Sequence, residues 1–144
     1  MPEKLSKTYA FDVETEARNV FVDITERVES VLANLELDSS VVHVFVPHTT
    51  AGVTIQENAD PDVRHDLLAK LDQLVPKDEP FYRHAEGNSD SHLKTSMVGN
   101  ATFVFARGRK LQLGRWQGIY LAEFDGPRTR QVMVKVFGSY SYDG

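Results

Sequence analysis

The stretch Val41–Glu57, VVHVFVPHTTAGVTIQE, joins two apolar segments through a polar bend. VVHVFV is rich in β-branched residues and has no breaker before Pro47, so we predict a buried strand. GVTIQE, which follows the His-Thr-Thr-Ala-Gly bend, predicts a second strand. A bend of this composition is either a turn that carries polar residues or one wall of a binding site. The other segments of the chain indicate which of the two interpretations holds.

Two amphipathic helices are expected on either side of this stretch. Asp23 is placed to cap the first, with Glu26 three residues later in a capping-box arrangement. The second is expected to begin at Pro61 behind an Asp60 cap and to end at Pro76. Both carry apolar residues at helical spacing, which predicts faces that cover a sheet. These residues are Ile24, Val28, Val31, Leu32 and Leu35 in the first helix and Val63, Leu67, Leu68, Leu71 and Leu74 in the second.

The segment 77–90, KDEPFYRHAEGNSD, shows no periodicity, and loops of this length in compact domains are often functional. Asn88 or Ser89 is expected to cap a short helix after it, with Gly99 as its end. Strands are predicted at 7–13, 19–24, 101–106, 110–113, 118–124 and 130–138.

Strands and helices are intermingled without regular β-then-α alternation. This predicts an α+β fold, with a mixed, mostly antiparallel sheet packed against two main helices and one short helix. The length of 144 residues is typical of a single domain, which we expect to span residues 1–144.

The composition excludes several classes of protein. Hydrophobic residues make up 41% and charged residues 26% of the chain, which is ordinary for a soluble globular protein. No segment is typical of a transmembrane helix or a signal peptide, so we expect a cytoplasmic protein without a membrane partner. The formal charge is −5 and no Lys/Arg cluster is interleaved with aromatics, so no nucleic-acid partner is expected. There is no cysteine, so any metal must be held by His, Asp or Glu.

Three of the five histidines meet if the long loop and the short helix fold over the end of the sheet. His48 ends the central strand, His84 lies in the loop, and His92 opens the helix. Three neutral imidazoles suit a divalent metal, zinc or magnesium, with a position left open for water or substrate. Their spacing matches no short ligand signature, so three locally hydrogen-bonded polar residues remain the alternative. His43 is expected within the sheet and His65 on a solvent-facing position.

Carboxylates supply the second part of a possible site. A hairpin between the two strands of the opening stretch carries Glu57 away from His48, so a shared site requires another pairing or a neighbouring subunit. Asp60 is better explained as a helix cap. Asp90 lies two residues before His92, where it can orient the imidazole or serve the turn.

The segment LGRWQGIYLAEFDGPRTR, residues 113–130, adds an aromatic and two cations. Trp116, the single tryptophan, stands beside Gln117 between two glycines, and it is either a core or interface anchor or part of a binding surface. Arg128 and Arg130 are able to clamp a phosphate or a carboxylate, because a guanidinium matches both in bidentate geometry. Surface ion pairing is the alternative.

Three blocks together resemble the YjbQ family: HTTAGVTIQENADPDVRHDL (48–67), YRHAEGNSDSHLKTSMVG (82–99) and LQLGRWQGIYLAEFDGPRTRQVMV (111–134). The resemblance implies an α+β domain that assembles as a homotrimer, with sites near the subunit boundaries. It implies a phosphorylated small-molecule ligand, a possible divalent metal and no organic cofactor. The implied activity is weak or secondary thiamine-phosphate synthesis from a pyrimidine pyrophosphate and a thiazole phosphate, with release of pyrophosphate.

The resemblance also groups the polar blocks into one site that neighbouring chains complete. It implies catalytic roles for His48, His84, His92, Glu57 and Asp90, and the three histidines are the candidate metal ligands. It implies substrate-binding roles for Thr49, Thr50, Asn58, Asn88, Trp116, Gln117 and Arg128, and Glu123 matches the family's tail. Gln56 and Arg115 depart from the family pattern, and Arg115 puts a charge beside the tryptophan.

Two other functions remain open because no complete catalytic signature is present. One is a metal-dependent hydrolase, in which the histidines bind zinc or a similar ion and activate water. The other is a binding module whose pocket holds a ligand without chemistry.

Overall fold

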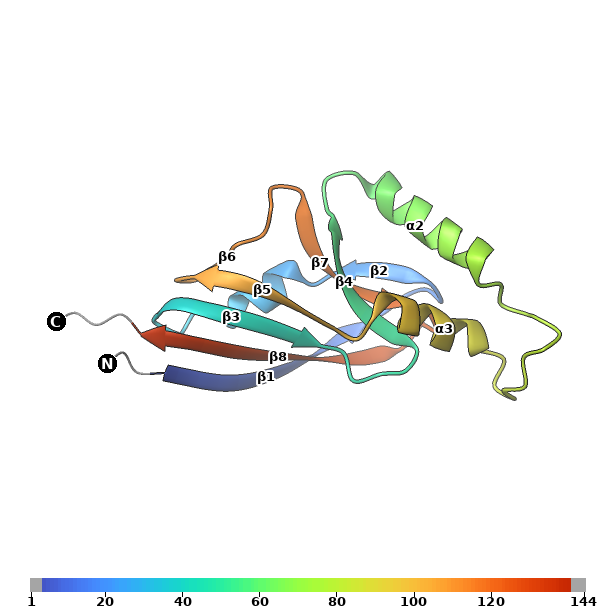
Figure 1. The fold of residues 1–144 in the computed structure, drawn as a ribbon, viewed down its shortest axis with the longest axis horizontal. Helices are drawn as coiled ribbons and strands as arrows, with labels where there is room; N and C mark the ends of the chain where they lie inside the picture. Colours follow the sequence, from blue (N-terminus) through green and yellow to red (C-terminus); the bar gives the residue numbers. More distant parts are fainter. Residues whose placement is uncertain (1–3, 141–144) are drawn as a thin grey trace.

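The computed structural model describes residues 4–140, which form two antiparallel sheets and three helices (Figure 1). The larger sheet has the strand order β1-β8-β3-β5-β6, and the smaller sheet has the order β2-β7-β4. The predicted α+β class is therefore confirmed. The elements are β1 (Lys4–Glu14), β2 (Val20–Asp23), α1 (Thr25–Ser30), β3 (Leu37–Phe45), β4 (Ala51–Glu57), α2 (Pro61–Leu74), α3 (Ser89–Val98), β5 (Ala101–Arg107), β6 (Lys110–Leu111), β7 (Gln117–Glu123) and β8 (Thr129–Tyr140).

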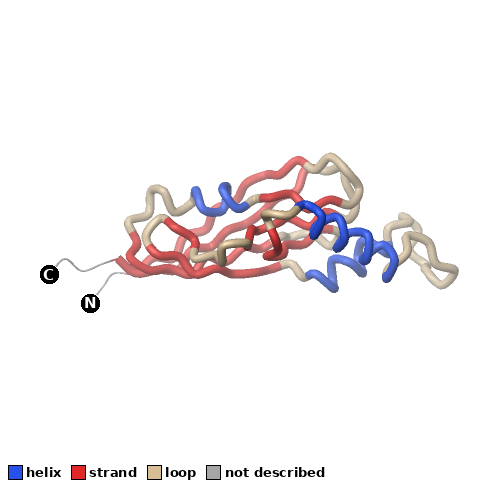
Figure 2. The backbone as a smooth tube through the Cα atoms, turned by 90° about the horizontal axis from the view of Figure 1, so that it is seen from above, coloured by secondary structure: helices blue, strands red, loops and turns tan. Residues whose placement is uncertain are grey.

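The core lies between the two sheets. Alternate residues of β3, β5 and β8, most of them valines, point inward from the larger sheet, and β4 and β7 of the smaller sheet close over them. Figure 2 shows α1 on one side of the molecule, while α2 and α3 lie together at the end away from the termini. The fully buried core side chains include Val42, Val44, Val134, Ile119 and Leu121.

The opening stretch forms two strands as predicted, but the strands belong to different sheets. β3 pairs with β5 and β8, whereas β4 pairs with β7, so the hairpin considered from the sequence does not form. The bend 47–50 carries the chain from one sheet to the other. The side chain of Asn100 secures this crossing, because its Nδ2 donates to the carbonyl oxygens of Val46, His48 and Ala51 at 2.8–3.2 Å. The bend is thus held at the end of the larger sheet.

The first helix differs from its predicted boundaries. Asp23 is the last residue of β2, Ile24 takes the N-cap position without a side-chain cap, and the helix ends at Ser30. The Asp23 carboxylate instead accepts hydrogen bonds from the backbone N and the Oγ1 of Thr25, at 2.9 and 2.6 Å. The helix therefore begins one residue later than predicted, with Ile24 and not Asp23 at the N-cap position, and among the described residues no hydrogen bond from Glu26 closes the predicted capping box. The predicted apolar face is confirmed, because Ile24, Val28, Leu32 and Leu35 are buried.

The second helix begins as predicted. The Asp60 carboxylate accepts a hydrogen bond from the backbone N of Asp62 at 2.9 Å, and Pro61 occupies the first turn. Its leucine stripe was expected to cover a sheet, yet no residue of α2 is buried, and Leu74 is 58% exposed. The reason is the narrowness of the smaller sheet: α2 lies along the edge strand β4, and three strands leave little surface for it to cover (Figure 1).

The third helix follows the long loop, with Asn88 at the N-cap position and Gly99 at its end with a φ of 99°. The Asn88 side chain makes no capping hydrogen bond. The strand predicted at 110–113 shortens to Lys110–Leu111. Across residues 4–140, none of the helices combines the length and the apolar character that a membrane crossing requires.

We expect Gly52→Ala to destabilise the fold by about 1–3 kcal/mol, because overpacking a well-filled contact costs roughly this much. A Cβ at Gly52 would collide with the backbone oxygen of Gly99, which already accepts a hydrogen bond from Val53 N at 3.1 Å. Chemical denaturation measures the loss. Gly114→Ala is the matched control, since its Cβ would meet only the flexible end of the Gln117 side chain. Equal losses in the two variants would contradict the close approach of β4 to Gly99.

Candidate functional site

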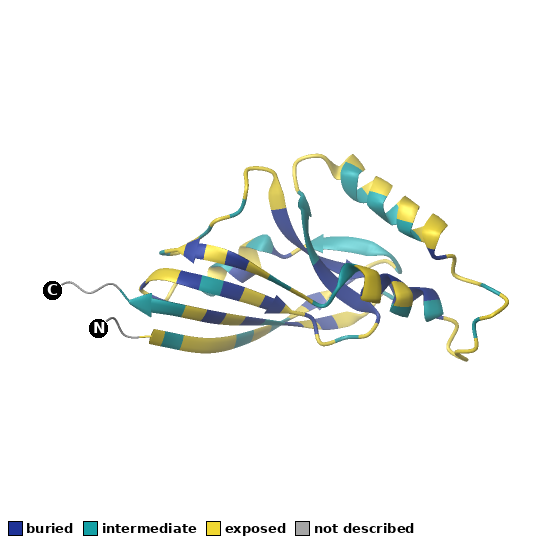
Figure 3. Ribbon diagram, in the orientation of Figure 1, coloured by how far each residue is buried: buried dark blue, intermediate teal, exposed yellow. Residues whose placement is uncertain are grey.

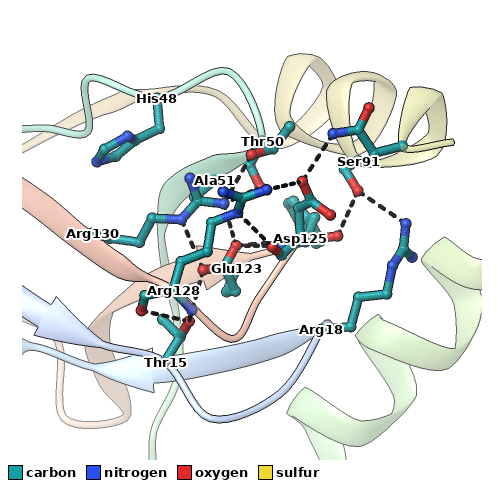
Figure 4. Close-up of polar contacts among 12 residues, drawn as sticks. Thr15, Arg18, His48, Thr50, Ala51, Ser91, Glu123, Asp125, Arg128 and Arg130 are labelled. Carbon is teal, nitrogen blue, oxygen red and sulfur yellow. Dashed lines mark hydrogen bonds and ion pairs between the residues drawn. The ribbon is translucent and has the colours of Figure 1, made fainter. Parts of the chain in front are cut away.

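A buried ion pair between Glu123 and Arg130 lies where the two sheets meet (Figure 4). Glu123 is fully buried and Arg130 is 4% exposed. Arg130 Nε donates to Glu123 Oε1 at 2.8 Å, and Nη2 donates to Oε2 at 2.5 Å. Nη2 also donates to Thr50 Oγ1 at 2.8 Å, and Thr15 Oγ1 donates to Glu123 Oε1 at 2.8 Å. The pair therefore ties β8 to β7 and to the start of β4.

The partners of this pair leave it little capacity for a ligand. Glu123 Oε2 accepts two further hydrogen bonds, from the backbone N of Phe124 at 3.1 Å and of Asp125 at 3.0 Å. Arg130 was considered as a phosphate clamp or a surface ion pair. It is neither in this fold, because its guanidinium is buried against Glu123 and Thr50.

His48 lies beside this network at the end of β3. Its Nε2 accepts a hydrogen bond from the backbone N of Gln131 at 3.0 Å, so the neutral ring carries its proton on Nδ1. Burial and the neighbouring Arg130 charge lower the pKa of His48, which favours this neutral form. A metal could take Nε2 only after the hydrogen bond to Gln131 had broken. Thr49 is exposed in the same bend, and Thr50 is buried.

We expect His48 to make the fold less stable as the pH falls. Its pKa is lowered in the folded state, so the unfolded chain binds the proton first, and stability is lost below the ordinary value of about 6.5. Thermal unfolding across this range should show a smaller loss for His48→Gln than for the wild type. His65→Gln on the exposed face of α2 is the control and should follow the wild type. Identical slopes for His48→Gln and the wild type would contradict this role.

Arg128 lies over a second carboxylate, Asp125. Its Nε donates to the Asp125 carbonyl oxygen at 2.8 Å, and its Nη2 donates to Oδ2 at 3.0 Å. The buried Asn88 donates from Nδ2 to the same Oδ2 at 2.9 Å. Burial alone raises the pKa of Asp125, but the hydrogen bonds from Asn88 and Arg128 outweigh it and the net pKa is lowered. The Arg128 side chain stays 53% exposed, so it is the cation of this group that a ligand can reach.

Asp90 is fully buried and faces Arg18 rather than His92. Arg18 donates to both carboxylate oxygens, at 2.9 and 3.0 Å. The buried Lys94 lies 3.7 Å from Asp90 and also contacts Asp72 of α2. Burial raises the pKa of Asp90, but the Arg18 hydrogen bond and the two positive charges outweigh it and lower the net value. This cluster therefore anchors α3 to the segment before β2 and to α2.

His84 and His92 come together at the other side of α3. Their ring centroids are 5.3 Å apart with the planes nearly perpendicular, and Glu86 Oε2 lies 3.7 Å from His84 Nε2. They open onto a hollow of about 600 Å³, which we call the histidine hollow. It is lined by Phe81, Tyr82, Arg83, His84, Ser89, His92 and Leu93.

The remaining predicted site residues gather at the far end of β4. Glu57 pairs with Gln117 there, and Asn58 Nδ2 donates to the Gln117 carbonyl oxygen at 3.1 Å. Trp116 is 53% exposed, with the Arg115 guanidinium 4.6 Å from its ring centroid. Since β4 has seven residues, this end lies about 20 Å from Thr50 at the other end. One chain therefore holds Glu57 well away from the bend that carries His48.

The three predicted metal ligands are divided in the same way. His84 and His92 share the histidine hollow, whereas His48 is not among its lining residues. Within residues 4–140, no three His, Asp or Glu side chains come together as a metal-holding group. Two of the three imidazoles thus meet in a single chain, and the described residues of one chain do not bring the predicted third ligand to them.

A profile of the family described as "UPF0047 protein YjbQ-like" matches residues 9–139. The chain belongs to the YjbQ family. Relatives within it include a UPF0047 protein of Methanocaldococcus jannaschii, 45% identical over 90% of this chain and 94% of that protein. YugU of Bacillus subtilis is 45% identical over 88% of this chain and 96% of its own.

Solved structures of YjbQ family members share the fold. A protein from Clostridium acetobutylicum superposes with a TM-score of 0.86 at 45% identity, covering 89% of this chain and 98% of that one. A YbjQ-like protein of unknown function from Sulfolobus solfataricus gives a TM-score of 0.88 at 27% identity, covering 94% and 99%. These relatives share the family and the fold with this chain, and their names state no activity.

Sequence reasoning missed several residues that position this YjbQ site. Arg18 holds Asp90, Lys94 joins α2 to α3, and Asn100 holds the bend before Thr50. Two local signals were available. Asp125 lies within the third family-like block, next to a glycine and a proline, and Lys94 follows Asp90 by four residues, the spacing of an ion pair on one helix. The partners of Arg18 and Asn100, and Asp72 as the second partner of Lys94, are distant in sequence.

Proposed function

We propose that this YjbQ protein binds a phosphorylated small molecule in the histidine hollow. The observation that carries the proposal is the pair of facing imidazoles, His84 and His92, beside Arg83 in one hollow. Imidazoles and a guanidinium are suitable donors to phosphate oxygens. The hollow also includes Ser89, the first residue of α3, and the amino end of a helix favours a negative charge.

The apolar part of the hollow supports a ligand with a flat ring. Phe81 and Tyr82 meet edge to face at 5.1 Å, and Leu93 completes the wall. Ligand pockets commonly combine such aromatic surface with a few polar groups that fix orientation. A heteroaromatic ring carrying a phosphate or pyrophosphate satisfies both parts.

The reaction we propose is formation of thiamine phosphate as a weak or secondary activity. A carbon–nitrogen bond forms between the pyrimidine methylene group and the thiazole nitrogen while the carbon–oxygen bond to pyrophosphate breaks. Charge builds on the departing oxygens, and cationic donors held nearby stabilise it. Arg83 and the two imidazoles are the groups of this chain that are placed to do so.

Self-association is part of the proposal, with a homotrimer as the expected state. The hollow is open on one side, where Phe81 is 72% exposed, and a neighbouring copy can cover it. His48, Thr49 and Arg128 lie outside the hollow of their own chain and are the residues that a neighbour would contribute. Glu57 and Trp116, at the far end of β4, are candidates for the same role.

Product formation from the pyrimidine pyrophosphate and the thiazole phosphate tests the reaction. We expect His92→Ala to lower the rate by about 10²–10⁴-fold, the usual contribution of a positioned acid–base or donor group, with the assembly intact. His48→Ala should also lose activity if a neighbour completes the site. His65→Ala is the matched histidine control and should retain wild-type turnover. Unchanged turnover in both His48→Ala and His92→Ala would refute the proposed reaction.

The facing imidazoles also favour a second candidate, a metal-dependent hydrolase. Two histidines suit zinc better than magnesium, which prefers oxygen ligands. Elemental analysis of protein purified without a histidine tag decides this. Less than about a tenth of an ion per chain, with no activity gained on adding zinc, would count against it. A ligand that binds and is recovered chemically unchanged would instead indicate a binding module.

A further inference from the structure

A second hollow lies between β1 and α1, together with the turn that follows α1. Its volume is about 380 Å³, which suits a small molecule, and we call it the edge hollow. β1 is an edge strand, since it comes first in the order of the larger sheet and, among the described strands, pairs with β8 alone. In Figure 3 it is banded for most of its length in the colours of exposed and half-buried residues.

Two aromatic rings form the wall of the edge hollow on the side of β1. Tyr9 and Phe11 are alternate residues of the strand, so their side chains share one face, and both are half-buried against the core. Val31, at the end of α1, adds apolar surface from the helix. Walls of this kind are typical of pockets that hold a flat organic ring.

Two basic side chains line the same hollow, each lying over one of these rings. The Arg27 guanidinium lies 4.3 Å from the centre of the Phe11 ring, and Lys7 Nζ lies 5.4 Å from the centre of the Tyr9 ring. Among the described residues, no carboxylate lines the hollow, and neither cation forms an ion pair. The edge hollow therefore carries two positive charges that residues 4–140 leave without an acidic partner.

A backbone N–H at the free edge of β1 adds a third donor. Arg27 Nη1 donates to the carbonyl oxygen of Asp12 at 2.6 Å, so this carbonyl points away from β8. Gln131, the register partner of Asp12, agrees with this, because its N–H donates to His48 and not to β1. In an antiparallel pair these orientations repeat at every second residue. The N–H of Ala10, which lines the edge hollow, therefore also points to the free edge.

We propose that the edge hollow binds a small organic anion made of a flat ring and a carboxylate group. Arg27 makes one side-chain hydrogen bond among the described residues, and its planar fork matches a carboxylate in bidentate geometry. Lys7 and the N–H of Ala10 are further donors to the same group. The rings of Tyr9 and Phe11 contact the apolar part of the ligand. They also hold the two cations in place beforehand, which reduces the side-chain entropy lost on binding.

The edge hollow is distinct from the histidine hollow. The two have no lining residue in common: β1 and α1 build one, whereas α3 and the loop before it build the other. In Figure 2, α1 lies apart from α3. The inference thus goes beyond the proposed function and does not depend on it.

Titration of the isotope-labelled protein with benzoate, followed by the backbone amide resonance of Ala10, tests the proposal. We expect a saturable shift of this resonance. Benzamide has the ring without the charge, and its affinity should be at least about tenfold lower because a charge-assisted contact is lost. Acetate has the charge without the ring, and it should also bind at least about tenfold more weakly because less apolar surface is buried.

Two variants remove one cation each. Arg27→Gln and Lys7→Gln should each lower the benzoate affinity measured at Ala10 by about tenfold. The Lys7 side chain is exposed and makes no hydrogen bond among the described residues, so Lys7→Gln should fold even if Arg27→Gln does not. Arg115→Gln is the matched control and should bind like the wild type, because its guanidinium also lies over a ring, 4.6 Å from that of Trp116, but does not line the edge hollow.

Three results would overturn the proposal. The first is a shift of the Ala10 resonance that is absent or does not saturate. The second is an affinity for benzamide or for acetate equal to that for benzoate, since either would remove the charge or the ring from recognition. The third is wild-type affinity in every cation variant that folds, as established by circular dichroism. Pyrophosphate takes no part in this titration, so failure here leaves the histidine hollow untouched, and failure of the proposed function leaves the edge hollow untouched.

Discussion

We expect Glu123→Ala to lower the free energy of unfolding by about 3–5 kcal/mol, because removing one partner of a buried ion pair leaves an uncompensated buried charge. Arg130, which is 4% exposed, would lose the Glu123 carboxylate as the acceptor of its Nε and Nη2 hydrogen bonds. Chemical denaturation monitored by circular dichroism measures the change.

The double variant Glu123→Leu/Arg130→Met is the matched control for this prediction. It removes both charges and fills the space with apolar groups, so it should be closer to the wild type than Glu123→Ala is. If Glu123→Ala lowered the free energy of unfolding by less than about 1 kcal/mol, the pair would contribute no more than an exposed ion pair does. The interpretation that it joins the two sheets would then be wrong.

Asp90→Ala should lower the free energy of unfolding by about 3 kcal/mol for a related reason, since two cations face a carboxylate that is fully buried. Lys94 would keep only Asp72 as a charged partner, and Arg18 would lose both of its bonds to the carboxylate. The anchoring of α3 would weaken, and with it the position of His92. We therefore expect weaker ligand binding as well as lower stability.

The matched control is Asp66→Ala, which removes a carboxylate that is 79% exposed on α2. Substitutions at such surface positions usually change stability by less than about 0.5 kcal/mol. Thermal and urea unfolding of the two variants decide the question. Similar losses in both would show that the Arg18–Asp90–Lys94 cluster does not anchor α3.

Local chemistry accounts for the parts of the fold that the sequence predicted. Asp60 and Pro61 start α2 as expected, because a cap and a first-turn proline act through neighbouring backbone groups. At Asp23 the same reasoning missed the helix start by one residue, since Ile24 takes the N-cap position although the Asp23 carboxylate still accepts a hydrogen bond from the backbone N of Thr25. It also could not foresee the exposure of Leu74, because the width of the sheet beside α2 is set by distant strands.

The candidate site shows more clearly what local sequence patterns do not predict. The prediction grouped His48, His84 and His92 by their position at strand and loop ends, and the fold brings only the last two together. The backbone N of Gln131, which donates a hydrogen bond to His48 Nε2, lies 83 residues from His48 in the sequence, and Arg18 lies 72 residues from Asp90. No spacing rule reaches over such separations. What the resemblance to the YjbQ family added was the set of polar blocks, and their geometry came from the fold.

The central claim is that the histidine hollow binds a phosphorylated ligand, and calorimetric titration with pyrophosphate tests it most directly. We predict binding to the wild type, an affinity at least about tenfold lower in His84→Ala/His92→Ala, and wild-type affinity in His65→Ala; a tenfold loss corresponds to about 1.4 kcal/mol. Equal affinity of the wild type and the double variant, or no binding to the wild type, would contradict the claim.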